Sequence, residues 1–138
     1  RGVGVDARRQ PGGKAAIDSP KMALGPCRGG AVRLAPATDA MLVAEGIETA
    51  LAALQATDQP TWASIGTSGL MALALPAGIR RVTILADGDA PGEAAARAAA
   101  ERWTREGREV RIARAPAGLD FSDVLAGRCV ASVAGVAA

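Results

Sequence analysis

The sequence predicts an α/β domain built on a mainly parallel β-sheet of about four strands, with helices on its faces. Short apolar runs alternate with helix-like segments, which is the pattern of parallel strands joined by helical crossovers. The runs are continuous rather than alternating in hydrophobicity, as expected of strands buried on both faces. They lie at Met41–Ala44, Thr61–Ile65, Arg81–Ala86 and Glu109–Ala113. A chain of 138 residues is long enough for one domain with its own core.

Helical segments separate these runs. They are expected at 47–56, 70–75 and 91–105, with a short final helix that opens at 120–123. Pro76 should stop the second of these helices. In the third, Pro91 suits the first turn and Gly107 suits the C-terminal cap. Glu93 should complement the helix dipole at the N-terminal end.

The chain divides into three parts by composition. Residues 1–38 form a basic lead-in with expected short strands at Gly2–Val5 and Ala31–Leu34, residues 39–128 form the main domain, and residues 129–138 form a C-terminal tail. Residues 1–39 carry seven Lys and Arg against three Asp, which is compatible with phosphate binding. Because the first residue is Arg1 and not Met, we expect a piece of a longer protein.

Composition excludes several classes of site. The chain has no histidine, so it cannot supply a Ser-His-Asp triad by itself. Cys27 and Cys129 do not have the spacing of a zinc site. Trp62, Trp103 and Phe121 are the whole aromatic content, so stacking of bases on aromatic side chains can contribute little. The sequence shows no signal peptide or membrane span, which predicts a cytoplasmic protein.

The most informative motif is Asp87-Gly-Asp89, which directly follows the apolar run that ends at Ala86. Open α/β sheets bind their ligands at the carboxyl ends of the strands. Two carboxylates at that edge repel each other unless a positive charge lies between them. Mg²⁺ prefers carboxylate oxygens, so the motif predicts a divalent metal site.

Further acids follow other strands, with Glu45 after the first and Asp120 and Asp123 after the fourth. Parallel strands share one carboxyl edge, so these acids could converge on the Asp pair. Helix capping is an alternative role for Asp120 and Asp123. The loop Gly66-Thr67-Ser68 could offer backbone N–H groups to a phosphate, or could be a plain strand-to-helix turn.

Taken together, these motifs resemble the Toprim domain of primases, topoisomerases and some nucleases. The resemblance rests on four motifs in order: Leu42-Val-Ala-Glu-Gly-Ile-Glu-Thr-Ala50, Ala63-Ser-Ile-Gly-Thr-Ser68, Ile84-Leu-Ala-Asp-Gly-Asp-Ala-Pro-Gly92 and Asp120-Phe-Ser-Asp-Val-Leu125. Their order is most similar to the DNA primase branch. The segment 24–34 resembles the lead-in of plasmid and prophage primase–helicase proteins.

The resemblance implies roles for individual residues. Glu45 would act as general acid/base or as a metal ligand, Asp87 and Asp89 would bind Mg²⁺ or Mn²⁺, and Asp120 and Asp123 would form the late acidic motif. Gly66, Thr67, Ser68 and Arg28 are the candidate phosphate contacts.

The implied activity is a Toprim-like nucleotidyl transfer that makes RNA primers from nucleoside triphosphates on single-stranded DNA. The implied partner is a helicase domain or protein, and no membrane association is implied. Many primases have an acid where this chain has Thr49, which weakens the case for a second metal ion. The piece alone could be inactive.

Other functions stay open at this stage. One is nuclease or topoisomerase-like phosphodiester chemistry on the same site, although a topoisomerase needs a Tyr and the chain has none. Another is a non-catalytic module that binds nucleic acid. A phosphatase of the haloacid dehalogenase type also uses Asp-x-Asp after a strand, but would leave Glu45 without a role.

Overall fold

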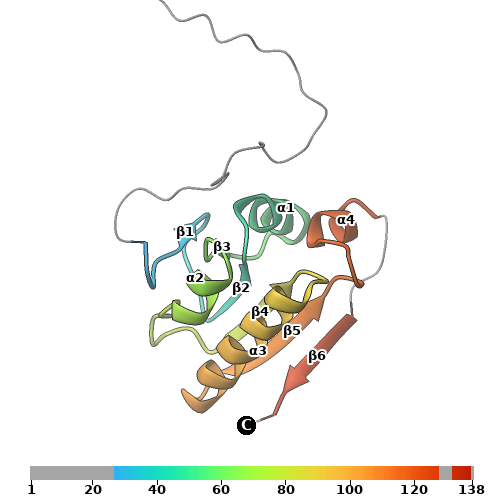
Figure 1. Cartoon of the computed structure of the whole chain (residues 1–138). Helices are drawn as coiled ribbons and strands as arrows, with labels where there is room; N and C mark the ends of the chain where they lie inside the picture. The colour runs from blue at the N-terminus through green and yellow to red at the C-terminus, as the bar shows by residue number, and fades with distance from the viewer. Residues whose placement is uncertain (1–26, 128–131, 138) are drawn as a thin grey trace, which may run out of the picture.

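A six-stranded β-sheet organises the chain (Figure 1). The computed structural model describes residues 27–127 and 132–137. The sheet order is β1-β3-β2-β4-β5-β6. The strands are β1 (Val32–Arg33), β2 (Ala40–Ala44), β3 (Thr61–Ala63), β4 (Arg81–Ala86), β5 (Glu109–Arg114) and β6 (Ser132–Val136).

The four central strands are parallel to one another, as the apolar runs predict. Val43 in β2 stands beside Trp62 in β3 and Ile84 in β4, and all three side chains are buried. Both edge strands are antiparallel to their neighbours, β1 to β3 and β6 to β5. Strand β1 lies within the expected Ala31–Leu34 strand, whereas the expected Gly2–Val5 strand falls outside the described residues.

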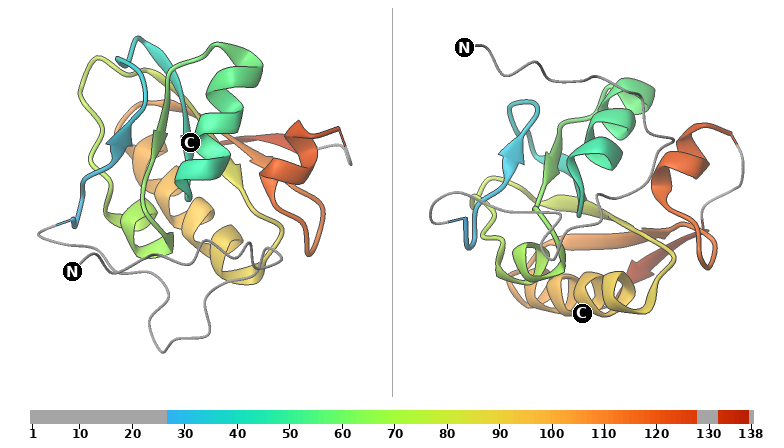
Figure 2. Two further views of the ribbon diagram at one scale, coloured as in Figure 1. Left: turned by 90° about the horizontal axis from the view of Figure 1, so that it is seen from above. Right: turned by 45° about the horizontal axis from the view of Figure 1, so that its top comes forward.

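Helices cover both faces of the sheet (Figure 2). They are α1 (Ile47–Thr57), α2 (Thr67–Ala72), α3 (Ala90–Arg105) and α4 (Phe121–Leu125). Helices α2 and α3 pack over one face and enclose the larger core cluster, which includes Trp62, Leu70 and Trp103. Helices α1 and α4 pack over the other face and enclose the smaller cluster, which includes Leu42, Leu85 and Phe121. The structure therefore confirms the α/β fold class.

Helix α3 approaches the sheet through small side chains. Its buried residues are Gly92, Ala95, Ala96, Ala99, Ala100 and Trp103, and Trp103 is fully buried. Alanine combines high helix propensity with little bulk, so this face lets the helix axis lie close to β4 and β5. The tight packing fixes where the first turn of α3 stands, immediately after the Asp87-Gly-Asp89 loop.

The expected bounds of helix α2 and the expected end of strand β3 were wrong. Helix α2 runs from Thr67 to Ala72, so it begins and ends three residues earlier than the expected helix at 70–75. Leu73 is extended, with ψ of 119°, because its buried side chain and those that follow pack against the core as a loop and not as a helix. Strand β3 ends at Ala63 rather than Ile65, because Ile65 adopts a left-handed conformation with φ of 60°.

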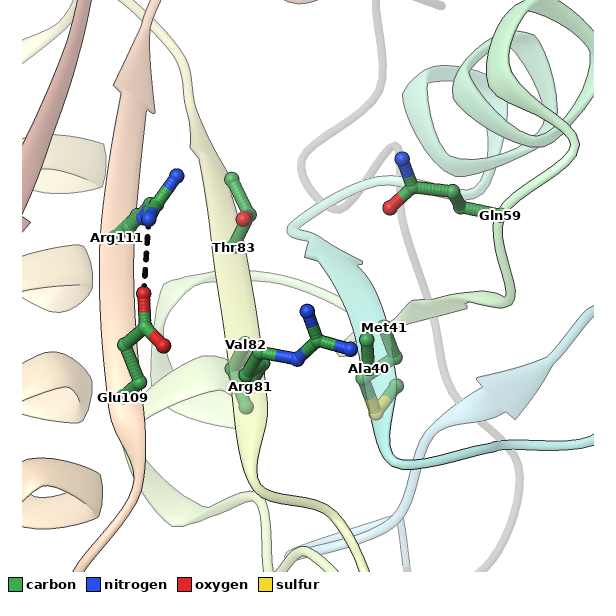
Figure 3. A pocket seen from close by; sticks show the side chains of 8 residues that line it. All are labelled: Ala40, Met41, Gln59, Arg81, Val82, Thr83, Glu109 and Arg111. Atoms are coloured by element: carbon green, nitrogen blue, oxygen red, sulfur yellow. Dashed lines mark hydrogen bonds and ion pairs between the residues drawn. The ribbon is translucent and has the colours of Figure 1, made fainter.

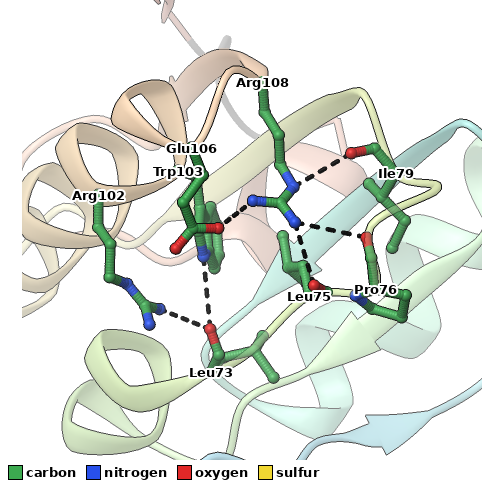
Figure 4. A network of polar contacts seen from close by, with 8 residues as sticks. All are labelled: Leu73, Leu75, Pro76, Ile79, Arg102, Trp103, Glu106 and Arg108. Carbon is green, nitrogen blue, oxygen red and sulfur yellow. Dashed lines mark hydrogen bonds and ion pairs between the residues drawn. The ribbon is translucent and has the colours of Figure 1, made fainter.

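The loop between α2 and β4 is held by α3 and the turn after it (Figure 4). Trp103 donates its indole N–H to the carbonyl oxygen of Leu73 at 3.4 Å. Arg108 donates to the carbonyl oxygens of Ile79 at 3.1 Å, Leu75 at 3.0 Å and Pro76 at 3.4 Å. The Arg108 side chain is only 9% exposed and also pairs with Glu106. These bonds satisfy carbonyl groups that no regular element would pair.

A hollow of about 290 Å³ lies at the amino-terminal ends of β2, β4 and β5 (Figure 3). Its polar side chains include Arg81 and Arg111, which form ion pairs with Asp39 and Glu109 respectively. It contains none of the site residues expected from the sequence, because those residues follow the opposite ends of the strands. No helix among the described residues is long and apolar enough to cross a membrane.

Candidate functional site

The loops that follow β2, β3, β4 and β5 all leave the carboxyl edge of the parallel part of the sheet. All four carry expected site residues, at Glu45, at Gly66, at Asp87 and at Asp120. The fourth loop leads from β5 to α4, which begins after Asp120. The parallel topology therefore brings segments that are far apart in sequence to one edge, as Figure 2 shows.

The Asp87-Gly88-Asp89 loop has a tightly defined backbone. Gly88 exchanges two backbone hydrogen bonds of 2.9 Å with the loop before α4, donating to Leu119 and accepting from Gly118. A Cβ atom on Gly88 would stand only 2.0 Å from the carbonyl oxygen of Pro116. Only glycine fits between these two segments, so the middle residue of the motif is fixed by close backbone approach.

The two aspartates have different local partners. Asp89 is the N-cap of α3, and its Oδ1 atom accepts a hydrogen bond from the Gly92 amide at 2.7 Å. The Oδ1 atom of Asp87 accepts a bond from the Phe121 amide at 3.3 Å, across 34 residues of sequence. Asp87 thereby connects the end of β4 to the start of α4, and both carboxylates have a fixed place at the edge.

Glu45 approaches the same loop from β2. Its Oε2 atom lies 3.5 Å from the point where a Cβ atom on Gly92 would stand, and the Oδ1 atom of Asp89 lies 2.8 Å from that point. The absence of a side chain at Gly92 therefore leaves the Asp89 carboxylate undisturbed, with the Glu45 carboxylate close to the same point. The backbone carbonyl of Glu45 also accepts a bond of 3.0 Å from the Gly66 amide, which connects this loop to the one after β3.

Asp120 and Asp123 lie at the start of α4. Asp120 is the N-cap, and its Oδ1 atom accepts from the Asp123 amide at 3.1 Å. Across residues 27–127 and 132–137, no three Asp, Glu, Cys or His side chains are close enough to surround one metal ion. The structure thus brings Glu45 and Asp89 together beside Gly92, while the five expected acids do not form a single cluster.

The expected phosphate contacts occupy two places. Gly66 caps α2 with φ of 93°, and Thr67 and Ser68 form its first turn. Gly69 is held close to the end of β3, since a Cβ atom there would stand 1.8 Å from the carbonyl oxygen of Ser64. Arg28 is exposed on a turn whose neighbour Gly29 lies against Ala72, at the other end of α2.

A hollow of about 300 Å³ opens beside the Asp pair, and we call it the acidic hollow. It is lined by Asp87, Gly88, Asp89, Ala90, Glu93, Arg114, Ala115 and Ala117. Glu93 accepts from the Nε atom of Arg114 through both carboxylate oxygens, at 3.0 and 2.9 Å, and from Arg97 at 2.7 Å. The hydrogen bond from Arg114 is the main cause that lowers the pKa of Glu93 below its ordinary value of 4.5, while burial opposes it.

Sequence reasoning did not select Arg114, and it gave Glu93 only a helix-dipole role. The two residues are 21 positions apart, one ending a strand and the other in the first turn of a helix. The available signal was its position, because Arg114 directly follows the apolar run Glu109–Ala113 and so lies at the same edge of the sheet as Asp87.

Comparisons with known proteins agree with this architecture. The family model of the Toprim domain matches residues 40–129, well over half of the chain. No curated protein matches the sequence.

Two solved structures are similar to the chain. One is a DNA primase domain from Pseudomonas aeruginosa, with 24% identity and a TM-score of 0.51, over 64% of this chain and 29% of that one. The other is a structure of the DnaG catalytic core, with 26% identity and a TM-score of 0.52, over 66% of this chain and 31% of that one. The chain spans well under half the length of the primase chains that it matches. From the extent of the family match, the chain belongs to the Toprim domain family.

Proposed function

We propose that this chain is the catalytic Toprim domain of a primase-like protein, which makes RNA primers on single-stranded DNA by metal-dependent nucleotidyl transfer. The observation that carries the proposal is the meeting of Glu45 and Asp89 beside Gly92, at the loop that also holds Asp87. The likeness to the DnaG catalytic core supports the primase branch over other Toprim proteins.

The side chains present suit a hard divalent cation. Mg²⁺ is usually held by only one or two carboxylates, and its remaining ligands are waters and substrate phosphates. Asp87 and Asp89 would supply these carboxylates, and the Oδ2 atom of Asp89 has no hydrogen bond to any residue in the described ranges. When bound, Mg²⁺ or Mn²⁺ would neutralise charge on the triphosphate as it reacts.

Other residues have proposed roles around that pair. Glu45 would accept the proton of the attacking 3′-hydroxyl or help to hold the cation. Gly66, Thr67 and Ser68 would offer backbone N–H groups to phosphate oxygens, and Arg28 would contact phosphates farther out. Asp120 and Asp123 are candidates to reach the ion through bound water.

Template and partners belong to the longer protein that we expect to contain this chain. Single-stranded DNA, nucleoside triphosphates and a helicase domain or protein are its proposed partners. The sequence places an excess of basic residues in 1–39, which suits contacts to a nucleic-acid backbone.

Primer synthesis by the full-length protein tests the proposal. Asp87→Asn and Glu45→Gln keep side-chain shape but remove charge or basicity, and each should reduce Mg²⁺-dependent synthesis by about 100-fold or more. Asp58→Asn is a matched control, because Asp58 lies at the C-terminal cap of α1 in a left-handed conformation that Asn tolerates.

Unchanged synthesis by Asp87→Asn and Glu45→Gln would overturn the proposal. The same preparations, incubated with nicked, single-stranded and duplex DNA and Mn²⁺, separate synthesis from cleavage. Cleavage that depends on Asp87 in the absence of any synthesis would favour the nuclease alternative.

A further inference from the structure

The acidic hollow contains one cationic side chain among its lining residues, Arg114. Arg114 is the last residue of β5 and pairs in the sheet with Ala86, the residue directly before Asp87. The sheet register therefore places a guanidinium next to the Asp pair. No expected role in phosphate or metal binding had been given to this position.

The guanidinium is held from one side. Its Nε atom donates to both carboxylate oxygens of Glu93, at 3.0 and 2.9 Å, and its Nη1 atom makes a long bond of 3.5 Å to the carbonyl oxygen of Ile112. The Nη2 atom donates no hydrogen bond to residues 27–127 or 132–137. The side chain is 28% exposed and lines the hollow, so a ligand there can contact Arg114.

Glu93 orients Arg114 rather than competing for the cation site. It is bound from its other side by Arg97, a surface residue in the next turn of α3. Both arginines favour the ionised carboxylate and lower the pKa of Glu93, so the pair with Arg114 persists at neutral pH. Glu93 therefore holds the guanidinium of Arg114 at the edge of the hollow that Asp87 and Asp89 also line.

A polyphosphate is the ligand that this arrangement of charges suits. A cation on Asp87 and Asp89 would draw a triphosphate into the hollow, where its oxygens would come next to the Nη2 donors. Guanidinium–phosphate hydrogen bonds are charge-assisted and directional. A plain structural ion pair would also join β5 to α3, but it would not affect the binding of a phosphate.

We infer that Arg114 binds phosphate oxygens of the nucleoside triphosphate whose metal ion Asp87 and Asp89 hold, and that Glu93 positions its guanidinium for this contact. The inference rests on the proposed function, because it takes the Asp pair as the cation site.

Calorimetric titrations of the whole chain test it with three probes: ATP with Mg²⁺, inorganic tripolyphosphate with Mg²⁺, and Mn²⁺ alone. Arg114→Met keeps the apolar stem of the side chain and removes the charge. We expect it to weaken the binding of both polyphosphates by about tenfold or more, with unchanged Mn²⁺ affinity. Arg114→Lys should recover part of this loss, because it restores the charge without the planar fork.

Arg97→Met is the matched control. It removes the other arginine that pairs with Glu93, but Arg97 is 66% exposed and does not line the hollow. We expect wild-type affinity for all three probes. Thermal unfolding of each variant checks that the fold is intact.

The outcomes distinguish an error in the role of Arg114 from an error in the proposed metal site. If Asp87→Asn abolishes Mg²⁺-dependent ATP binding while Arg114→Met binds ATP and tripolyphosphate as the wild type does, the role of Arg114 is wrong and the proposed metal site stands. If ATP binding is absent in the wild type, or is unaffected by Asp87→Asn, both proposals fall together. A loss for ATP without a loss for tripolyphosphate would contradict a phosphate contact.

Discussion

The amide of Gly92 donates a hydrogen bond of 2.7 Å to Oδ1 of Asp89. Because glycine has no Cβ atom, nothing at this position displaces that oxygen. A Cβ atom on Gly92 would stand 2.8 Å from this oxygen and 3.5 Å from Oε2 of Glu45. Gly92 thus binds the Asp89 carboxylate through its amide, and a residue with a side chain at this position would push that carboxylate away.

Gly92→Ala should displace the Asp89 carboxylate with little loss of stability. The nearest atom to the new methyl group is the end of a flexible side chain, so the carboxylate moves and the helix stays. Alanine within a helix is also favoured over glycine by about 1 kcal/mol. We expect Mn²⁺ affinity, measured by calorimetry, to fall by about tenfold while the unfolding midpoint in urea changes little.

Gly78→Ala is the control for this substitution, because a Cβ atom there would meet nothing within 4 Å. It should leave Mn²⁺ affinity unchanged. Wild-type affinity in Gly92→Ala would show that the carboxylate beside Gly92 is not part of a metal site.

Arg108→Met should destabilise the fold far more than Arg111→Met. Arg108 is 9% exposed and binds three backbone carbonyl oxygens of the loop between α2 and β4. Its removal would take these bonds from Leu75 and Ile79, whereas Pro76 keeps a bond from the Ile79 amide. The expected loss is about 2–3 kcal/mol in the free energy of unfolding. Arg111 is 58% exposed and pairs with Glu109, so its replacement should cost roughly 0–1 kcal/mol. Urea unfolding measures both, and equal losses would contradict the loop-holding role of Arg108.

The ion pair of Glu93 should appear in the pH dependence of stability. The folded-state pKa of Glu93 is lowered, mainly by its hydrogen bond to Arg114. Its contribution to stability is therefore complete above the ordinary value of 4.5 and is lost as pH falls through the lower folded value. Glu93→Gln should be less stable than the wild type at pH 6, and the difference should shrink as pH falls below about 4.5.

Arg114→Met provides the check, because it removes the main cause of that shift. In the Arg114→Met background, Glu93→Gln should lose most of its pH-dependent effect in a double-mutant cycle. A difference between wild type and Glu93→Gln that is constant from pH 6 to pH 3 would contradict the pKa assigned to Glu93.

Much of the fold could be predicted from hydrophobic runs and helix signals. The four parallel strands are apolar because both of their faces are buried, and α3 carries its Pro, its acidic first turn and its terminal Gly. Strand β6 gave no such signal, because Val133 is 61% exposed at the edge of the sheet and the segment contains Gly135. The position of helix α2 was predicted wrongly because Leu73 and Leu75 are buried in a loop. Buried apolar residues give the same sequence pattern in a loop as in a helix.

For the candidate site, the sequence predicted which residues lie at the carboxyl edge of the sheet, because the order of the strands determines this. The rule that ligands bind at the carboxyl ends of parallel strands selected Glu45, Asp87 and Asp89, and the structure brings their loops to one edge. Which acids meet depends on backbone contacts that sequence does not display, such as the approach of Gly88 to Pro116. Asp120 instead forms the cap of α4, one of the two roles its position allowed.

The proposed function requires the Asp87-Gly88-Asp89 loop to bind a divalent cation. Its most direct measurement is a calorimetric titration of the chain with Mn²⁺, comparing the wild type with Asp87→Asn and with the remote control Asp58→Asn. We expect the wild type and Asp58→Asn to bind Mn²⁺ alike and Asp87→Asn to bind at least about tenfold more weakly. Equal binding by all three proteins, or no binding by the wild type, would contradict it.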